Sequence, residues 1–499
     1  MNNDEKYQNN QDLINQDKER FERVKEIVEQ VETREILTKN KNAQDKIDAI
    51  LTNKWFGIPI FAVVMFLVFW ISQVGPGAWI AEGYEFENFT IPGLVTLIEM
   101  LGEWVGGLFA TDGLIKSILV DGIIGGVGAV IGFLPLVMVM YFLIALLEDC
   151  GYMARVSVIL DPLFKKVGLS GKSVIPFVVG TGCSIPGVMA CRTIKDERER
   201  TATAMLTPFM PCGAKLPVIT LFAGAFFSDS SWVGPLMYFV GIILIFVCAY
   251  IIKLITGAKY KKSYFIIELP EYKAPSFGKA TMSMLQRGWS YIVKAGTVIL
   301  VCNFVVILMQ SFNWRFQYVE NINDSILHDI ATPFGYVIAP FIGIAVWQLA
   351  AAAITGFIAK ENVVGTLAVA FVGLENLINA EELTLIEGSG SAVANIIAIT
   401  KVAALAYLMF NLFTPPCFAA MGAMRSEIKE KKWFWAGIGM QLGVGYSLAF
   451  LVFFFGTLFT TRQFGAIWMP IVGWVITLFF FAIITLCIVK KQRELKKVK

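Results

Sequence analysis

The sequence is poor in charged residues and in histidine, and both shortages exclude whole classes of protein. Only 16% of the 499 residues are Asp, Glu, Lys or Arg, too few for an ordinary soluble protein of this length. The single histidine, His328, excludes a histidine-built metal centre. The eight cysteines form no Cys-x-x-Cys pair, so we expect neither a disulfide framework nor a zinc ribbon. A net charge of +3 gives no reason to expect nucleic acid binding.

The chain is rich instead in long apolar runs. Hydrophobic residues make up 56% of it, and the mean hydropathy is +0.64. Charge-free runs of this length predict an all-α polytopic membrane protein with roughly ten transmembrane helices. The predicted crossings are Trp55–Ala81, Gly122–Leu147, a run ending near Ser228, Ser230–Ile252, Ala295–Trp314, Ile330–Ala359, Asn362–Leu374, Gly388–Thr400 and onward, Trp433–Thr461 and Gln463–Val489.

Loop charge predicts the orientation. The stretches Pro76–Asp112 and Phe371–Asn395 carry acidic residues and no Lys or Arg, so both are expected outside. The basic segments Lys259–Arg287, Arg425–Lys432 and Lys490–Lys499 are expected in the cytoplasm by the positive-inside rule. The prediction is therefore a multi-pass protein of the plasma membrane, the inner membrane in a cell with two, with both termini cytoplasmic.

Composition changes along the chain predict five regions. Residues 1–54 are polar, lack a cleavable apolar segment, and space Phe21, Val24, Ile27, Val28 and Val31 as one helix face, which predicts a cytoplasmic helical arm. The remaining regions are a first membrane helix with an acidic external loop, two membrane repeats, and C-terminal membrane helices with a basic tail. Their bounds are 55–112, 113–287, 288–434 and 435–499.

The two central regions carry similar landmarks in the same order. Gly151–Arg155 and Gly356–Lys360 both read glycine, aromatic, apolar, alanine, base. A cysteine within helix-breaking sequence follows each of them, Cys183 in the first and Cys417 in the second. We interpret this as an internal duplication, an arrangement that places substrate sites of many transporters near the bilayer midplane.

The two cysteine-bearing breaks are the leading candidates for function. Gly180–Gly187 and Phe413–Ala420 combine glycine or proline with a thiol inside otherwise apolar sequence. Irregular backbone at membrane depth survives where it is buried in protein or lines a polar cavity. Thiols suit Fe²⁺, Zn²⁺ or Cu⁺, whereas Mg²⁺ and Ca²⁺ prefer oxygen. The sequence therefore predicts Cys183 and Cys417 as ligands along a path for a small cation.

Carboxylates could complete such a path. Glu148, Asp149 and Glu361 are the candidates, although Glu148 and Asp149 could equally lie at the cytoplasmic interface. Lys215 and Lys401 are expected to be structural charge partners or snorkelling groups and not ligands, because a protonated lysine repels a cation. The segment Gly168–Ser173 imitates a phosphate loop, but Lys166 stands where the first glycine is required, so nucleotide binding is not expected there.

These stretches together resemble the membrane domain of the FeoB family of bacterial ferrous iron transporters. The resemblance runs over nearly the whole chain from about residue 20 and rests on specific motifs. They are Leu147–Arg155, Gly168–Ser173, Gly180–Gly187, Arg192–Thr193, Pro211–Pro217, Ala359–Thr366 and Pro415–Cys417. It implies two gate-type repeats with discontinuous helices. It also implies an ion path through Cys183 and Cys417, with Glu148, Asp149, Cys212 and Glu361 as weaker candidate ligands.

The resemblance further implies Fe²⁺ uptake, with the chain as the permease part of a GTP-dependent system. That family begins with a GTP-binding domain, whose motifs are missing here, so residues 1–54 would be the end of its spacer. The expected partners are a separate GTPase and a small FeoA-like protein, with homo-oligomerisation left open. The chain is not expected to be an enzyme or to hold a resident cofactor. A carrier of nucleosides, of Zn²⁺ or of Mn²⁺, and a non-transporting membrane assembly subunit, remain as alternatives.

Overall fold

The computed structural model describes most of the chain from Ile50 onward. The described residues are 22–23, 47–48, 50–86, 89–107, 124–227, 232–256, 272–315, 317–319, 321–371, 374, 376–379, 384–386, 389–460 and 466–497. The chain divides into two units, Met1–Ala49 and Ile50–Lys499, of which the second contains the whole membrane part. Most of the predicted arm at 1–54 lies outside the described residues, as do 87–88 and 108–112 of the first predicted acidic loop and 372–373, 375, 380–383 and 387–388 of the second. The described part of the first acidic stretch is not a plain loop, since it contains two helices and a hairpin.

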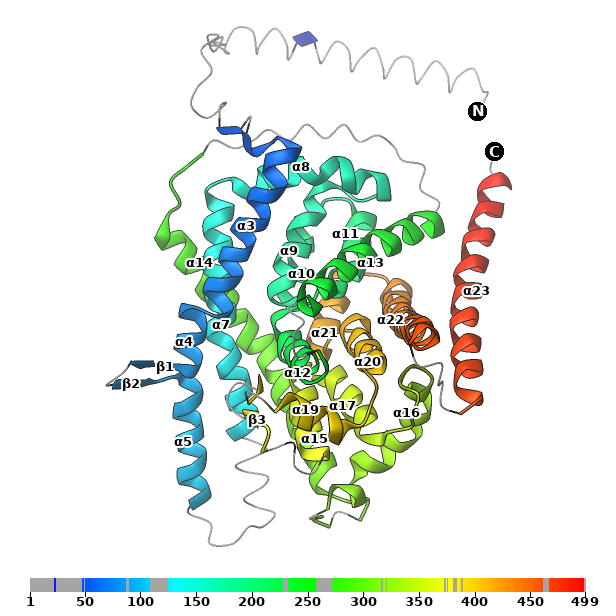
Figure 1. Ribbon diagram of the computed structural model, residues 1–499. Coiled ribbons are helices and arrows are strands. Elements are labelled where there is room, and N and C mark those ends of the chain that lie inside the picture. Colours follow the sequence, from blue (N-terminus) through cyan, green and yellow to red (C-terminus); the bar gives the residue numbers. More distant parts are fainter. Residues whose placement is uncertain are drawn as a thin grey trace. The chain divides into compact units, whose positions relative to one another are not determined.

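The first half of the large unit consists of membrane helices followed by four short ones (Figure 1). Asn53 caps the first helix, since its side chain accepts a hydrogen bond from the backbone N–H of Trp55. The elements are α3 (Lys54–Gln73), α4 (Pro76–Glu82), β1 (Gly83–Phe86), β2 (Phe89–Pro92), α5 (Leu94–Gly107), α7 (Gly125–Asp149), α8 (Tyr152–Val167), α9 (Val174–Gly182), α10 (Ser184–Ala190), α11 (Glu197–Leu206) and α12 (Leu216–Phe226). Short 3₁₀ turns lie at η2 (Gly171–Ser173), η3 (Cys191–Thr193), η4 (Thr207–Phe209) and η5 (Gly213–Lys215).

The second half follows a long apolar helix, α13 (Val233–Thr256). A π-helical segment, η6 (Ile292–Gly296), joins α14 (Phe277–Tyr291) to α15 (Thr297–Ser311) without a break in helical backbone. The other elements are η7 (Ile322–Asp324), α16 (Ile326–Ile342), α17 (Trp347–Ile358), α18 (Asn362–Ala370), β3 (Ile378–Asn379), β4 (Thr384–Leu385), α19 (Gly390–Ile397), α20 (Lys401–Phe413), α21 (Phe418–Glu427), α22 (Lys431–Phe459) and α23 (Trp468–Lys497).

The architecture confirms the predicted all-α polytopic membrane protein. It also contains two small antiparallel hairpins, β1–β2 and β3–β4. Among the described residues, seven helices or broken helices are long and apolar enough to cross a bilayer, or eight if the bent pair α16–α17 counts as one span. That is fewer than the roughly ten predicted. Two predicted crossings, Ala295–Trp314 and Asn362–Leu374, became the shorter helices α15, with 15 residues, and α18, with 9. The run from Gly388 forms α19, with 8 residues, and continues past Lys401 into a span of membrane length, Lys401–Glu427.

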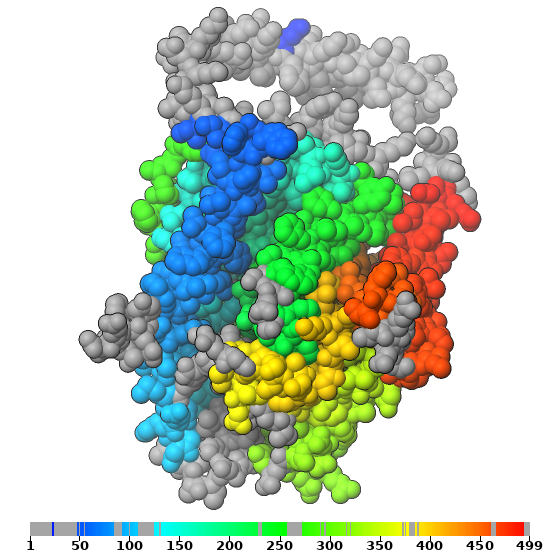
Figure 2. All heavy atoms as spheres, in the orientation of Figure 1, coloured from blue at the N-terminus to red at the C-terminus, as the bar shows by residue number. Residues whose placement is uncertain are grey.

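The outermost helices present apolar side chains as a lipid-facing surface would. Figure 2 shows α3 and α23 on the visible face of the large unit. On α3, Trp55 is 85% exposed and Phe66 is 67% exposed, and on α23 Leu486 is 68% exposed. In water such a surface would be costly, whereas hydrocarbon tails can cover it.

Broken helices meet in the interior instead. There α10 packs against α21, and α12 packs against α20 (Figure 1). Both α9–α10 and α17–α18 are pairs of short helices joined through an extended residue. Cys183 alone separates the first pair, whereas Ala359 begins the three residues between α17 and α18. These residues have nearly the same backbone angles, φ −148° and ψ 133° at Cys183 and φ −147° and ψ 125° at Ala359.

The two halves therefore do repeat a structure, but the positions that correspond to each other differ from those that the sequence landmarks predict. Gly151–Arg155 begins α8, whereas Gly356–Lys360 ends α17 and follows it, so that match is accidental. The structural counterpart of Cys417 is Cys212, since both follow a Thr-Pro step and then a Pro-Cys step in a broken span. Short glycine-aromatic matches recur by chance in a chain so limited in composition, which explains the wrong pairing.

Candidate functional site

The first break is the turn between α9 and α10 at Cys183. Glycine is required around it, because a Cβ on Gly182 would lie 1.6 Å from the Sδ atom of Met140. A Cβ on Gly187 would lie 2.6 Å from the Cα atom of Gly180, so the two short helices touch at a glycine pair. This close approach turns the chain back within the protein and leaves the Cys183 thiol at the tip, 7% exposed.

The second break separates α11 from α12. Met210 and Cys212 have extended backbone between the 3₁₀ turns η4 and η5, and Cys212 is buried. A Cβ on Gly213 would lie 3.2 Å from the carbonyl oxygen of Gly182 and 3.0 Å from Oε1 of Gln73. The second break therefore lies directly beside the first, and glycine at position 213 allows that contact.

The third break follows α20, whose last carbonyls meet two prolines. In a continued helix, the N–H groups at positions 415 and 416 would donate to the carbonyls of Asn411 and Leu412. Pro415 and Pro416 have no N–H, so both carbonyls need other donors. Cys417 stands just beyond them and begins α21 as its N-cap residue.

Two buried lysines from other breaks satisfy these carbonyls. Lys360 Nζ donates to the carbonyl of Asn411 at 2.9 Å, and Lys215 Nζ donates to that of Leu412 at 2.5 Å. Lys215 also donates to the carbonyl of Pro208 at 3.1 Å. The predicted charge partner of Lys215 is not what these bonds show, since its hydrogen-bond acceptors are backbone carbonyls. Lys401 is an exposed residue at the start of α20, far along the helix from the break.

The three breaks bring the predicted thiols together. Cys183 and Cys417 pack in one apolar cluster with Tyr291 of α14 and Ile299 of α15. Cys183 also interacts electrostatically with Cys212, Cys417 and Glu361. Four of the six predicted site residues, Cys183, Cys212, Cys417 and Glu361, thus share one region between the two halves of the unit.

This region does not form a complete metal centre. Among the described residues, no group of three or more His, Cys, Asp or Glu side chains is placed to hold a metal ion together. A resident metal needs a preformed ligand set, whereas a transported ion must bind loosely enough to leave.

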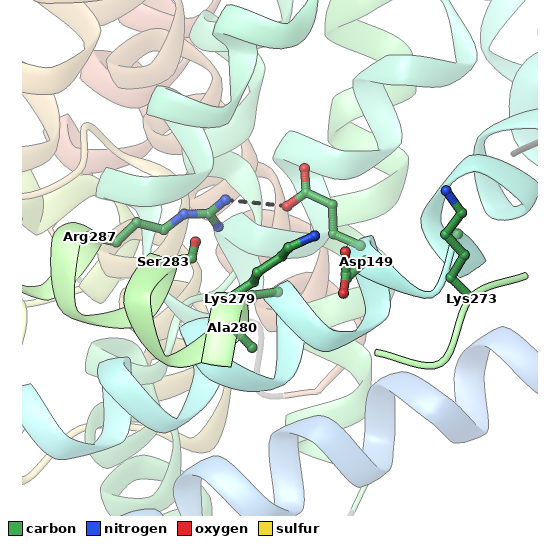
Figure 3. A pocket seen from close by; sticks show the side chains of 9 residues that line it. Asp149, Lys273, Lys279, Ala280, Ser283 and Arg287 are labelled. Carbon is green, nitrogen blue, oxygen red and sulfur yellow. Dashed lines mark hydrogen bonds and ion pairs between the residues drawn. The ribbon is translucent and has the colours of Figure 1, made fainter. Parts of the chain in front are cut away.

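Glu148 and Asp149 lie in another place. They line a cavity of about 630 Å³ at the end of α7, together with Lys273 and the α14 residues Lys279 and Arg287 (Figure 3). Glu148 Oε2 is 3.2 Å from Nη2 of Arg287.

Asp149 binds the residue that precedes α14, its N-cap residue Ser276. Its Oδ2 accepts hydrogen bonds from the backbone N–H of Ser276 at 2.8 Å and from the Ser276 hydroxyl at 3.1 Å. Both carboxylates are thus held by partners on or next to α14, and the structure does not bring them to the break cysteines.

The sequence analysis missed several groups around the thiols. Tyr141 of α7 and Tyr291 of α14 both interact electrostatically with Cys183, and Tyr291 also interacts with Cys417 and Glu361. Met140 adds a thioether sulfur beside Gly182. No local signal marks these residues, because aromatic and methionine side chains on apolar helices are ordinary core residues.

Family comparisons divide the membrane unit between two descriptions. Residues 130–226 and 292–431 match the Gate family, described as nucleoside recognition. Residues 235–287, which lie between these two stretches, match the family described as ferrous iron transport protein B C terminus. Together with the broken helices, these matches define a polytopic membrane protein of the gate type.

Individual relatives make the identification specific. The Fe(2+) transporter FeoB of Staphylococcus aureus is 34% identical over 437 residues, which cover 83% of this chain and 59% of that protein. The Fe(2+) transporter FeoB of Shigella flexneri is 32% identical over 450 residues, 82% of this chain and 57% of that protein. The chain belongs to the FeoB family and spans somewhat over half the length of these relatives.

A third relative is named as a fusion of two proteins. The Porphyromonas gingivalis protein named Fe(2+) transport protein A/Fe(2+) transporter FeoB fusion protein is 32% identical over 463 residues, 84% of this chain and 52% of that protein. No solved structure matches the chain significantly.

Proposed function

We propose that this chain carries Fe²⁺ across the membrane along a path through the three helix breaks. The observation that supports this proposal is the convergence of Cys183, Cys212 and Cys417 with Glu361 inside an apolar helical protein. Sulfur and carboxylate together suit a borderline cation such as Fe²⁺, and a loose ligand set suits passage. The relatives named as Fe(2+) transporters support the same substrate.

The direct test is anaerobic Fe²⁺ uptake by proteoliposomes that contain the chain. Cys183→Ser and Cys417→Ser should each reduce uptake, because a hydroxyl is a harder and weaker ligand than a thiol. Cys248→Ser is the control, since Cys248 is also a buried thiol but lies within the plain apolar helix α13. Unchanged uptake in both break variants would contradict the ligand role. Parallel assays with Zn²⁺ and Mn²⁺ decide the metal.

We further propose that GTP acts on this path through a separate GTPase domain or chain, so that this chain does not itself hydrolyse GTP. The support is the absence of a phosphate-loop motif at Gly168–Ser173, where Gly171–Ser173 form a 3₁₀ turn. Uptake measured with and without an added GTPase and GTP tests this. A FeoA-like partner is proposed by analogy with the fusion relative. The basic tail supports a cytoplasmic C-terminus, which protease protection of vesicles can test.

A nucleoside carrier is the second candidate, because residues 130–226 and 292–431 match a family described as nucleoside recognition. Competition between Fe²⁺ and nucleosides for uptake separates the two candidates. Fe²⁺ uptake that nucleosides do not reduce supports the ion path. Uptake of a labelled nucleoside that Fe²⁺ does not affect would favour the second candidate.

A further inference from the structure

The C-terminal end of α20 is contacted by two lysine side chains that belong to the protein. Lys215 is 1% exposed and Lys360 is 3% exposed, and each donates to a carbonyl that a proline leaves without its helical donor. Within the part of the chain that the structure describes, neither lysine forms an ion pair with a carboxylate. The carbonyl oxygens are therefore the main partners of both ammonium groups.

Burying an ammonium group without a carboxylate is costly, so the surroundings must supply negative potential. The end of a helix does so, because its aligned peptide dipoles place about half a negative charge at the C-terminus. The carbonyls of Asn411 and Leu412, which lack helical donors, concentrate this potential at two oxygens. Lys215 comes from the break between α11 and α12, and Lys360 from the break between α17 and α18, so both halves of the unit supply a charge.

Such a helix end is where repeat-built transporters commonly hold a coupling ion. In discontinuous membrane helices, unwound carbonyls and half-helix C-terminal ends coordinate Na⁺ or H⁺. Here the carbonyls that would face a monovalent cation already bind lysine ammonium groups at hydrogen-bond distance. A free ion could enter only by displacing a side chain that is covalently attached beside it.

We propose that Lys215 and Lys360 act as tethered cations, which permanently fill a monovalent-cation site at the C-terminal end of α20. Transport then needs no co-transported Na⁺ or K⁺. The lysines are positioning residues: they hold α20 against the two other breaks and so fix the backbone that carries Cys417. This inference concerns only the end of the helix, so it does not depend on which substrate the protein carries.

The test is to remove one tethered cation and offer free ones. Lys360→Ala should lower the thermal unfolding temperature of the purified protein in choline chloride, because the Asn411 carbonyl loses its donor. Na⁺ or methylammonium at equal ionic strength should recover at least half of that loss. The wild-type protein should respond equally to all three salts. A lysine with a purely structural role would give no cation-specific recovery.

Lys253→Ala is the matched control. Lys253 Nζ also donates to a backbone carbonyl, that of Lys166 at 2.7 Å, but at an exposed site. Its replacement should change the unfolding temperature little and should give no cation-specific response. If Lys360→Ala does not fold, Lys360→Met serves instead, since it removes the donor to the Asn411 carbonyl but keeps a long apolar side chain. The same recovery by Na⁺ or methylammonium is expected.

Two results would overturn the proposal. One is a wild-type protein that Na⁺ or K⁺ stabilises, or whose uptake either ion stimulates, because the site would then be open. The other is a folded Lys360 variant that no monovalent cation stabilises. Since the unfolding measurement needs no transport, these outcomes are separate from a failure of the proposed Fe²⁺ uptake.

Discussion

The ion pair between Arg192 and Glu427 should contribute more stability than its partly exposed position suggests. Arg192 directly follows α10 and Glu427 ends α21, so the pair joins the exits of the first and third breaks. Arg192 Nε lies 2.6 Å from Glu427 Oε1, and the two side chains are 55% and 5% exposed. The carboxylate is thus almost fully buried, while the guanidinium is half hydrated.

This asymmetry sets the expected magnitude. A hydrogen bond to a charged group contributes about 1.5–3 kcal/mol, and hydration of the arginine places this pair near the lower limit, about 1.5 kcal/mol. Arg192→Met leaves the Glu427 carboxylate with Ser426 Oγ, at 3.4 Å, as its remaining neighbour in the described part of the chain. The pair Arg287–Glu148, with side chains 41% and 55% exposed, should contribute about 0.5 kcal/mol.

A double-mutant cycle separates the two cases. Arg192→Met, Glu427→Gln and their combination are compared by unfolding in mixed detergent micelles, and Arg287→Met with Glu148→Gln forms the control cycle. The coupling energy of the first pair should exceed that of the second by about 1 kcal/mol. Equal coupling energies would refute the argument that burial of one partner decides the strength of the pair.

Two further predictions concern glycine and the α7–α14 contact. Gly182→Ala should destabilise the protein by about 1–3 kcal/mol, because its Cβ would collide with Met140 Sδ. Gly365→Ala, on a helix position with no atom within 4 Å of the new Cβ, should stabilise it by up to about 1 kcal/mol; equal effects in thermal unfolding would contradict the packing argument. Asp149→Ala should speed amide hydrogen exchange at Ser276, the residue before α14, since it removes the acceptor for both Ser276 donors. An unchanged exchange rate would show that Asp149 does not hold the start of α14 in place.

The sequence predicts the fold class and the chemistry of the breaks because both are local. Apolar length alone separates membrane helices from loops, and a cysteine beside proline or glycine marks irregular backbone within them. Cys183 and Cys417 could therefore be chosen without knowledge of the fold, and the structure brings them into one cluster. Whether they bind the ion remains a prediction.

The supporting groups could not be predicted because their contacts are distant in the sequence. Pro415 and Pro416 identify the two carbonyls that lack a donor, since the helical hydrogen-bond pattern is known. The donor to Leu412 is Lys215, which lies 197 positions away, and only the fold shows that it arrives there. For Glu148 and Asp149 the sequence left two positions open. Hydropathy alone could not decide whether these carboxylates lie at the membrane interface or in the interior of the protein.

The π-helical segment η6 has a consequence for the helical phase of the helix that lines the thiols. Tyr291 and Ile299 are eight positions apart, which in a regular α-helix would turn them about 80° from each other. A π-helical turn absorbs one extra residue, so the same two side chains return to within about 20°. Both can then face Cys183 and Cys417 from one side, and a single residue deleted from Ile292–Gly296 would turn one of them away.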